Sequence, residues 1–463
     1  MRYIGFIMLI ICVAGCAVNP MTGKRELMIF SDAQEIEFGQ SADPNIRWQF
    51  GGLYNDDSIS SYVNSVGQKV AAVCDRSNIP YHFAVVDTSV INAFALPGGY
   101  VYITRGLLAK LDNEAELASV LGHEIGHINA RHSMKRLQSN IGFNVLISIV
   151  DQVASGSEGY QKRSGLIKGA SSIAFATVSL GYGRKDELEA DALGTKYAAK
   201  GGYSPEGMVQ LLELLKSLSE REPSSVEEFF MSHPKTSIRI TEVNKQIAQM
   251  PADQKNNALN QSGYKAKVAD LVQAQKAYDH YDKGEELRRN GKYNEALSEY
   301  NQALKIRSNI APPHYGIGLI YQAQGKHSAA ISEYKKAVAI DSDYIFAYNR
   351  MGEAYIAMKQ YDEAETALKK AITVYPSFDD AFANLGEAYY GLKRYSDGLK
   401  SLEMAITLNN THQRAYTTLG LIFEAMGDSQ KAIEAYEAAI KVAPESSYTN
   451  TARQRLSAIK KSN

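Results

Sequence analysis

The pentapeptide His123-Glu124-Ile125-Gly126-His127 carries the residue types that a catalytic zinc site needs. Positions i and i+4 of a helix lie on one face, so this spacing brings both imidazoles to the same side. Zn²⁺ accepts nitrogen and carboxylate ligands in tetrahedral geometry, and a catalytic site leaves one position to water. Glu124 lies beside that position and can accept the proton of the water as a general base. The motif therefore predicts one zinc ion per chain, bound by His123 and His127.

A helix must carry this motif, and the preceding residues predict where it begins. Asn113 is a favourable N-cap, and Glu116 stands three residues later at the capping-box position. Leu117, Val120 and Leu121 then follow at helical spacing. The histidines should therefore fall well inside a helix.

Two histidines do not hold a catalytic zinc, so a third protein ligand is expected. The segment Glu187-Leu188-Glu189-Ala190-Asp191 opens a second helical pattern. Glu187 and Asp191 share a face at i and i+4, whereas Glu189 points roughly the opposite way. Spacing suggests Glu187 as the third ligand and Asp191 as an acceptor that orients a ligating histidine. A merely solvated acidic helix start explains the same residues equally well on spacing alone.

The first residues are typical of an export signal. A basic residue precedes an apolar run over residues 3–13, which is too short to span a bilayer. The run ends in Val13-Ala14-Gly15-Cys16, which resembles a bacterial lipobox, although an ordinary signal peptide with an incidental cysteine is the alternative. The residue after the cysteine is Ala17 and not Asp, which by resemblance to sorted lipoproteins implies the outer membrane and not the inner one. We therefore expect a signal peptide over residues 1–15 and a lipid anchor at Cys16, at the periplasmic face of the outer membrane.

Length, charge and cysteine content narrow the function further. A chain of 463 residues is too long for one ordinary core, so two or more domains are expected. The formal net charge of -1 gives no electrostatic case for binding nucleic acid. Beyond the N-terminal segment only Cys74 remains, so no disulfide framework is available. Its apolar surroundings predict a buried, inert thiol.

The second half of the chain repeats with a period of 34 residues. Small residues occupy two positions of each repeat: Gly284, Gly318, Gly352, Gly386 and Gly420, with Ala303, Ala337, Ala371, Ala405 and Ala439. They let two antiparallel helices approach closely, which is the tetratricopeptide pattern. We expect five such repeats over residues 277–446 and a capping helix over residues 447–463. Such an array forms a concave surface for a peptide or a partner protein.

The ordered motifs resemble the gluzincin metallopeptidase family that contains HtpX and the CAAX prenyl endopeptidases. The resemblance rests on His-Glu-x-x-His, the downstream Glu-x-x-x-Asp, the stretch 92–108, and His233-Pro234 with Arg239. It covers roughly residues 28–245. With the repeats, the layout is similar to the BepA-like subgroup of β-barrel assembly-enhancing proteases.

The resemblance implies further roles for named residues. Glu187 matches the family's third ligand, which supports the argument from the helical face. His233 is implied to approach the zinc, either as a latch that displaces water or as a stabiliser of the oxyanion. A histidine before a loop proline without metal contact is the alternative. An extended edge that pairs with the substrate backbone is implied for Asn92, Ala93, Phe94 and Ala95.

Two other features carry weaker expectations. His132 lies five residues beyond His127, so helical spacing puts it off the ligand face. Residues 141–183 are rich in glycine, serine and aliphatic residues, but the apolar run there is too short to span a membrane. We interpret that segment as a mobile cover over the active site.

The sequence thus predicts a mainly α-helical chain with a zincin-type α+β metallopeptidase domain, helices around a short sheet, over residues 16–250. A linker and first helix over residues 251–276 lead to the tetratricopeptide α-solenoid. The expected activity is a zinc-dependent endopeptidase of the bacterial envelope that cleaves misfolded or stalled periplasmic and outer-membrane proteins. The repeats would recruit substrate or the barrel-assembly machinery. The alternative is a non-proteolytic chaperone or scaffold for outer-membrane protein assembly.

Overall fold

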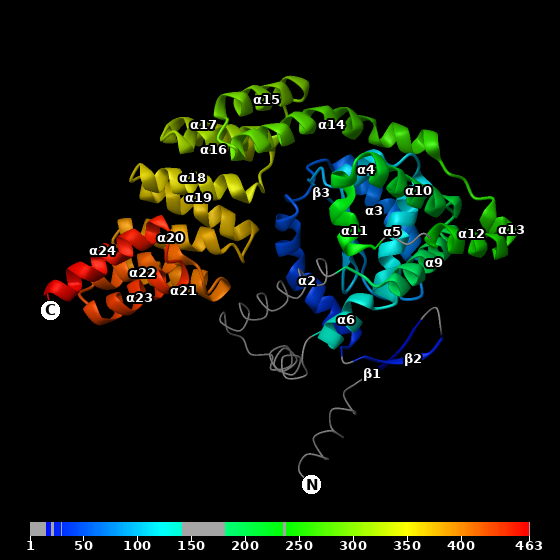
Figure 1. Cartoon of the computed structure of the whole chain (residues 1–463), viewed down its shortest axis with the longest axis horizontal. Coiled ribbons are helices and arrows are strands. Elements are labelled where there is room, and N and C mark those ends of the chain that lie inside the picture. The colour runs from blue at the N-terminus through cyan, green and yellow to red at the C-terminus, as the bar shows by residue number, and fades with distance from the viewer. Residues whose placement is uncertain (1–14, 20–22, 29, 141–180, 235–237, 463) are drawn as a thin grey trace, which may run out of the picture. The chain divides into compact units, whose positions relative to one another are not determined.

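A computed structural model of the chain describes residues 15–19, 23–28, 30–140, 181–234 and 238–462. It divides into two compact units between Gln275 and Lys276. The expected signal peptide, apart from residue 15, and the expected cover, apart from residues 181–183, lie outside the described residues. No helix in the described ranges is long and apolar enough to cross a membrane. The predicted fold class, mainly helical with a small sheet, is confirmed (Figure 1).

The first unit contains a three-stranded sheet in the order β3-β5-β4. β3 (His82–Val86) runs parallel to β5 (Tyr100–Thr104). β4 (Ala93–Leu96) pairs antiparallel with the other side of β5, so it is an edge strand of the described sheet. A separate antiparallel hairpin joins β1 (Gly15–Val18) to β2 (Arg25–Met28), and its register sets Cys16 opposite Leu27.

The turn between β4 and β5 requires glycine. Gly98 and Gly99 have φ angles of 80° and 102°, a region that residues with a side chain rarely adopt. A Cβ atom on Gly99 would lie 1.9 Å from the carbonyl oxygen of Pro80. This turn therefore fixes the register in which β4 lies along β5.

The helices of the first unit are α2 (Asp32–Gln49), α3 (Asp57–Ala71), α4 (Arg105–Lys110), α5 (Glu114–Asn129), α6 (His132–Asn140), α9 (Arg184–Lys200), α10 (Glu206–Arg221), the 3-10 turn η1 (Pro223–Val226), α11 (Glu227–Ser232), α12 (Arg239–Gln249), α13 (Ala252–Lys255) and α14 (Gln261–Arg289). The central element is α5, whose residues 115–129 are all buried. It packs against α9, α10, α3 and strand β4. Helix α14 begins in the first unit and ends in the second.

The start of α5 differs in one detail from the predicted capping box. The Asn113 side chain accepts a hydrogen bond from the Glu116 backbone N–H at 3.0 Å, as an N-cap should. Glu116, however, accepts from the backbone N–H of Asp112 at 2.7 Å and from the Asn113 side-chain amide, and not from the Asn113 backbone. The prediction of a reciprocal capping box was therefore wrong, while the predicted helix start is confirmed.

Glycines bring α5 and α9 unusually close together. A Cβ atom on Gly126 would lie 2.9 Å from the Ala190 carbonyl oxygen, and one on Gly122 would lie 2.9 Å from the Gly194 carbonyl oxygen. A Cβ atom on Gly194 would in turn lie 2.7 Å from the His123 backbone nitrogen. Gly126, inside the pentapeptide, thus lets Glu187 and Asp191 of α9 reach the histidines of α5.

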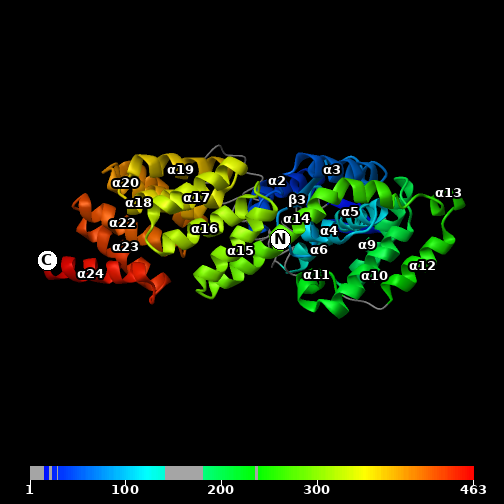
Figure 2. The same ribbon diagram turned by 90° about the horizontal axis from the view of Figure 1, so that it is seen from above.

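The second unit begins with the end of α14 and continues as α15 (Tyr293–Ile306), α16 (Ala311–Ala323), α17 (His327–Ile340), α18 (Ile345–Ala357), α19 (Tyr361–Val374), α20 (Asp379–Gly391), α21 (Tyr395–Leu408), α22 (Gln413–Ala425), α23 (Ser429–Val442) and α24 (Ser447–Ser462). Successive helices pack as pairs, which Figure 2 shows as a stack of short helices. The last helix, α24, packs against α22 and α23 and buries Ala452 and Ile459 there.

The repeated glycines make the helix pairs possible. The residue 16 positions after each glycine packs against it, and a Cβ atom on the glycine would lie within 2.5 Å of that side chain. The pairs are Gly284 with Tyr300, Gly318 with Tyr334, Gly352 with Leu368, Gly386 with Leu402, and Gly420 with Tyr436. The 34-residue period therefore reflects one close contact that recurs between the two helices of every repeat.

Candidate metal centre

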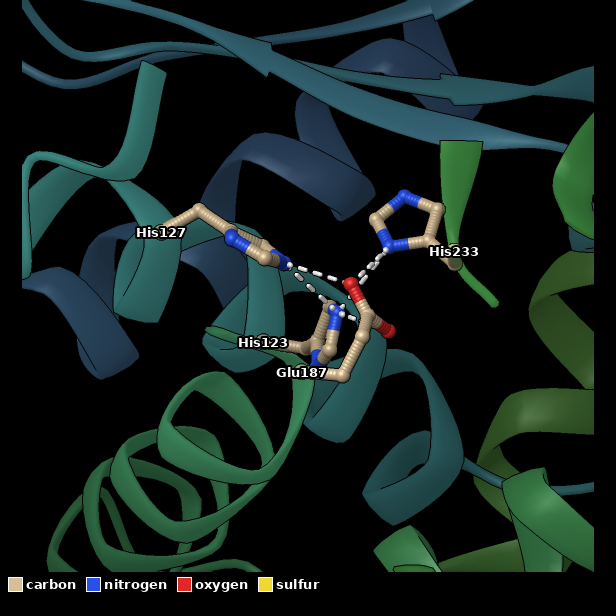
Figure 3. A group of neighbouring side chains, drawn as sticks. All are labelled: His123, His127, Glu187 and His233. Carbon is tan, nitrogen blue, oxygen red and sulfur yellow. Dashed lines mark hydrogen bonds and ion pairs between the residues drawn. The ribbon is translucent and has the colours of Figure 1, made fainter. Parts of the chain in front are cut away.

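Four buried side chains from three parts of the first unit converge on one point. His123 and His127 come from α5, Glu187 comes from the first turn of α9, and His233 follows α11. One ligand atom from each lies within 4.8 Å of all the others. Figure 3 shows the two imidazoles of α5 facing the glutamate and the third imidazole.

The separations of these atoms fit a tetrahedral metal ion. His123 Nε2 lies 3.0 Å from His127 Nε2 and 3.3 Å from His233 Nδ1. Glu187 Oε1 lies 3.1 Å from His233 Nδ1 and 3.4 Å from His127 Nε2. Four ligands on tetrahedral zinc with bonds of about 2.0–2.1 Å are about 3.3 Å apart. These four separations are close to that spacing, and all four ligand atoms lie within 4.8 Å of one another, so the donor set suits zinc.

Asp191 and Arg239 set the orientation of the cluster. Asp191 Oδ1 lies 2.9 Å from His123 Nδ1, and a carboxylate can only accept, so the proton sits on Nδ1. This leaves the lone pair of His123 Nε2 directed at the other ligand atoms. Arg239 Nε lies 2.6 Å from Asp191 Oδ2, and its Nη1 lies 2.8 Å from Glu187 Oε2. One guanidinium thus ties together the orienting carboxylate and the ligating one.

The second histidine of the pentapeptide has partners of its own. His127 Nδ1 lies 2.9 Å from His132 Nδ1, across the junction of α5 and α6. The ring of Tyr182 stacks on His127 with centroids 3.6 Å apart, and its hydroxyl lies 2.9 Å from Ser133 Oγ. His127 is therefore held at one ring edge and on one ring face.

The buried and charged groups of the cluster shift one another's pKa values. Burial acts to raise the pKa of Glu187, but the nearby charges of His233 and Arg239 hold it well below its usual range. Burial acts to lower the pKa of His233, but the carboxylate of Glu187 raises it overall. Burial lowers the pKa of His127 well below its usual value, which keeps that imidazole neutral. A neutral imidazole is the form that binds a metal.

Glu124 lies against this cluster with unused hydrogen-bonding capacity. Its Oε1 lies 3.6 Å from His233 Nε2. Among the described residues, no hydrogen-bond partner reaches Glu124 Oε2 or His233 Nε2, although both atoms are buried. Buried polar atoms without partners are costly, so both are suited to a water or a substrate group. Burial also raises the pKa of Glu124, which favours its acceptance of a proton.

The structure brings most of the predicted site residues together. Asn92, Ala93, Phe94 and Ala95 form or adjoin the edge strand β4, and α5 packs against that strand. Phe94 stacks on Tyr102 with ring centroids 4.9 Å apart. Cys16 belongs to strand β1. Cys74 is buried, and its thiol contacts only the Tyr81 hydroxyl among the interactions described.

Sequence reasoning missed three contributors to the site. Helical spacing puts His132 off the ligand face, so the sequence predicts no role for it in the site. The α-helix ends at Asn129, and Arg131 adopts a φ angle of 55°. Helical spacing therefore cannot predict where the His132 side chain points. Arg239 was noted only as part of a motif, and no signal in the sequence pairs it with Asp191. Tyr182 lay in a segment interpreted as a cover, and no spacing rule connects it to His127.

This fold and this site define a zincin-type metallopeptidase domain joined to a helical-repeat domain. Residues 58–247 match the family described as Peptidase family M48. Segments between residues 284 and 446 match tetratricopeptide repeat families. The predicted relationship is thereby confirmed.

Named relatives share the peptidase part. The β-barrel assembly-enhancing protease of Yersinia pestis is 32% identical over 237 residues, which are 50% of this chain and 47% of the relative. The mitochondrial metalloendopeptidase OMA1 of Arabidopsis thaliana is 30% identical over 205 residues, 43% of this chain and 39% of the relative. This chain therefore spans about half the length of the curated relatives it matches. A thermophilic TPR protein of Thermus thermophilus, 23% identical, aligns over 40% of this chain and 98% of its own with a TM-score of 0.34.

Proposed function

We propose that the chain is a zinc-dependent endopeptidase of the bacterial envelope that cleaves misfolded or stalled periplasmic and outer-membrane proteins. The observation that carries the proposal is the set of four buried ligand atoms that lie within 4.8 Å of one another, with the Glu124 carboxylate beside them. Zinc at this place supplies the Lewis acidity that activates water and polarises a peptide carbonyl. The name of the Yersinia relative, a β-barrel assembly-enhancing protease, supports a connection with the assembly of β-barrel proteins.

Glu124 is proposed as the group that moves protons. Its buried Oε2 has no hydrogen-bond partner among the described residues, and its raised pKa suits a group that takes a proton and later gives it to the leaving amine. Asp191 is proposed to hold His123 in the tautomer whose Nε2 is free. These two carboxylates therefore have different tasks, which their surroundings enforce.

His233 is proposed as a latch in this conformation. Its Nδ1 occupies one of the four ligand positions, and its Nε2 faces Glu124. A ring in that position excludes water from the place where Glu124 would act. The side chain must therefore swing away before a substrate can react, which would keep the enzyme silent until a substrate arrives.

The edge strand and the repeats are proposed to bind substrate. A strand with one unpaired edge accepts an extended peptide through main-chain hydrogen bonds, with little selectivity for side chains. The concave face of the tetratricopeptide unit is proposed to recruit the unfolded chain or the machinery that assembles barrels. A lipid anchor at Cys16 would hold the protein at the periplasmic face of the outer membrane.

The test compares variants of the full chain purified in detergent. Bound zinc and cleavage of an unfolded outer-membrane barrel protein are measured for wild type and Glu124→Gln. The variant should keep its zinc and lose at least about 100-fold in rate, because a general base contributes about that much. Glu114→Gln, on the same helix but outside the cluster, should keep full activity.

Other outcomes reject parts of this function. Equal activity of wild type and Glu124→Gln, or full function without zinc, would favour the repeat chaperone or scaffold instead. His233→Ala should raise the cleavage rate if the side chain is a latch. A loss of activity with zinc retained would instead assign His233 to the oxyanion.

A further inference from the structure

His132 is brought to the metal centre by a sharp change in chain direction. Helix α5 ends at Asn129, Arg131 adopts a left-handed φ of 55°, and α6 begins at His132. The His132 side chain is 1% exposed. Its ring centroid lies 5.0 Å from that of His127, and the two Nδ1 atoms lie 2.9 Å apart. At that distance one Nδ1 must donate and the other must accept.

The geometry of His127 decides which way this hydrogen bond runs. Its Nε2 faces the other ligand atoms, so its lone pair lies there and its Nδ1 carries the proton. His127 Nδ1 therefore donates and His132 Nδ1 accepts. The other ring nitrogen of His132 lies 3.6 Å from Glu189 Oε2 and 3.7 Å from Asp186 Oδ1, and no hydrogen-bond partner reaches it among the described residues.

This hydrogen bond fixes the tautomer of His127, as the hydrogen bond to Asp191 fixes the tautomer of His123. With its proton on Nδ1, His127 carries its lone pair on Nε2, which faces His123 Nε2 at 3.0 Å and Glu187 Oε1 at 3.4 Å. The stacked ring of Tyr182 keeps the imidazole from rotating. Hydrogen-bond partners of metal-bound histidines typically contribute about 10–100-fold to metal affinity.

We propose that His132 is a positioning residue for the metal centre: it accepts a hydrogen bond from His127, and its other ring nitrogen faces Glu189 and Asp186. The first histidine of the pentapeptide is thus oriented by a carboxylate, and the second by an imidazole. This assignment rests on the zinc site of the proposed function.

The test measures zinc affinity, by competition with a chromogenic chelator, for the full chain in detergent. His132→Asn keeps an acceptor oxygen near the place of Nδ1, whereas His132→Phe fills the space without one. We expect His132→Phe to lose about 10–100-fold in zinc affinity and His132→Asn to stay within about threefold of wild type. Equal losses in the two variants would mean that His132 only fills space, and an unchanged affinity in His132→Phe would overturn the proposal outright.

A second pair of variants protects the test against misfolding. Glu189 lies toward the surface, with its side chain 11% exposed, so it tolerates substitution better than His132. Glu189→Leu should weaken zinc binding severalfold, and Glu189→Gln, which keeps an acceptor, should not. Failure of the wild-type chain to bind zinc would reject the proposed function itself. Unchanged zinc affinity in His132→Phe and Glu189→Leu, with normal zinc binding by wild type, would reject only the role of His132.

Discussion

Replacing Arg239 with methionine should destabilise the metal-free peptidase domain by about 3–5 kcal/mol. The Arg239 side chain is 5% exposed and contacts both oxygens of Asp191, at 2.6 and 2.7 Å, and Glu187 Oε2 at 2.8 Å. Burial acts to lower the pKa of Arg239, but the two carboxylates hold it above its usual value, so the guanidinium is charged. Methionine fills part of the same space but leaves two buried negative charges without their cation. Breaking a buried ion pair in this way carries the stated cost.

The cost is measured as the thermal midpoint of the peptidase transition in chelator-treated protein. For a domain of about 150–250 residues, 1 kcal/mol corresponds to about 2–4 °C, so the midpoint should fall by about 6–20 °C. Asp191→Asn removes one of the charges that Arg239→Met leaves unpaired. The double variant should therefore be at least about 1 kcal/mol more stable than the sum of the two single costs predicts.

A second buried arginine supplies the control. The side chain of Arg105 is 2% exposed and lies 2.7 Å from Asp87, with Gln275 as a further partner. Arg105→Met should cost a similar amount, but its cost should add to that of Asp191→Asn within about 0.5 kcal/mol. A cost below about 1 kcal/mol for Arg239→Met, or simple additivity with Asp191→Asn, would refute the view that Arg239 neutralises the carboxylates of Asp191 and Glu187.

Two further predictions concern pH and the repeats. Burial raises the pKa of Glu116 from 4.5 to about 7, so the folded state favours the neutral carboxyl, and this stabilisation, present below pH 4.5, is lost as the pH rises through 7. The difference between these two pKa values corresponds to about 3.4 kcal/mol of unfolding free energy, which solvent screening reduces to about 2 kcal/mol. In wild type the unfolding free energy should fall by this amount between pH 5 and 8, and Glu116→Gln should remove the fall. Gly420→Ala should lower the thermal midpoint of the repeat unit more than Gly386→Ala. Its Cβ would lie 2.4 Å from the rigid ring of Tyr436, whereas the neighbour of Gly386 is a flexible leucine.

Both predictions have matched controls. Glu213 is exposed on α10, so Glu213→Gln should leave the pH profile of stability unchanged. An identical fall with pH in Glu116→Gln and wild type would contradict the assigned cause. For the repeats, equal midpoints in Gly420→Ala and Gly386→Ala would mean that the ring of Tyr436 moves aside as readily as the side chain of Leu402 does.

Features that repeat along one helix could be predicted from the sequence. The spacing of His123 and His127, and that of Glu187 and Asp191, follows from the helical period alone, and the structure shows each pair on one helix. The 34-residue period likewise predicted the helix pairs of the second unit. What the period could not supply is the distance between α5 and α9. That distance depends on Gly122, whose role as a close contact is visible only once its partner helix is known.

The parts of the site that escaped prediction share a physical cause, which is that each depends on chain direction outside a regular helix. Arg239 meets Asp191 across 48 residues of chain, and no spacing rule spans such a gap. His132 meets His127 because a single left-handed residue reverses the expected direction of its side chain. Such contacts form only when several segments fold together. Metal binding and the folding stability of the domain are therefore coupled. A metal site supported in this way should form together with the whole fold. Replacement of Arg239 or of His132 should therefore lower both the zinc affinity and the free energy of unfolding, and the sizes of the two effects should differ between the two variants.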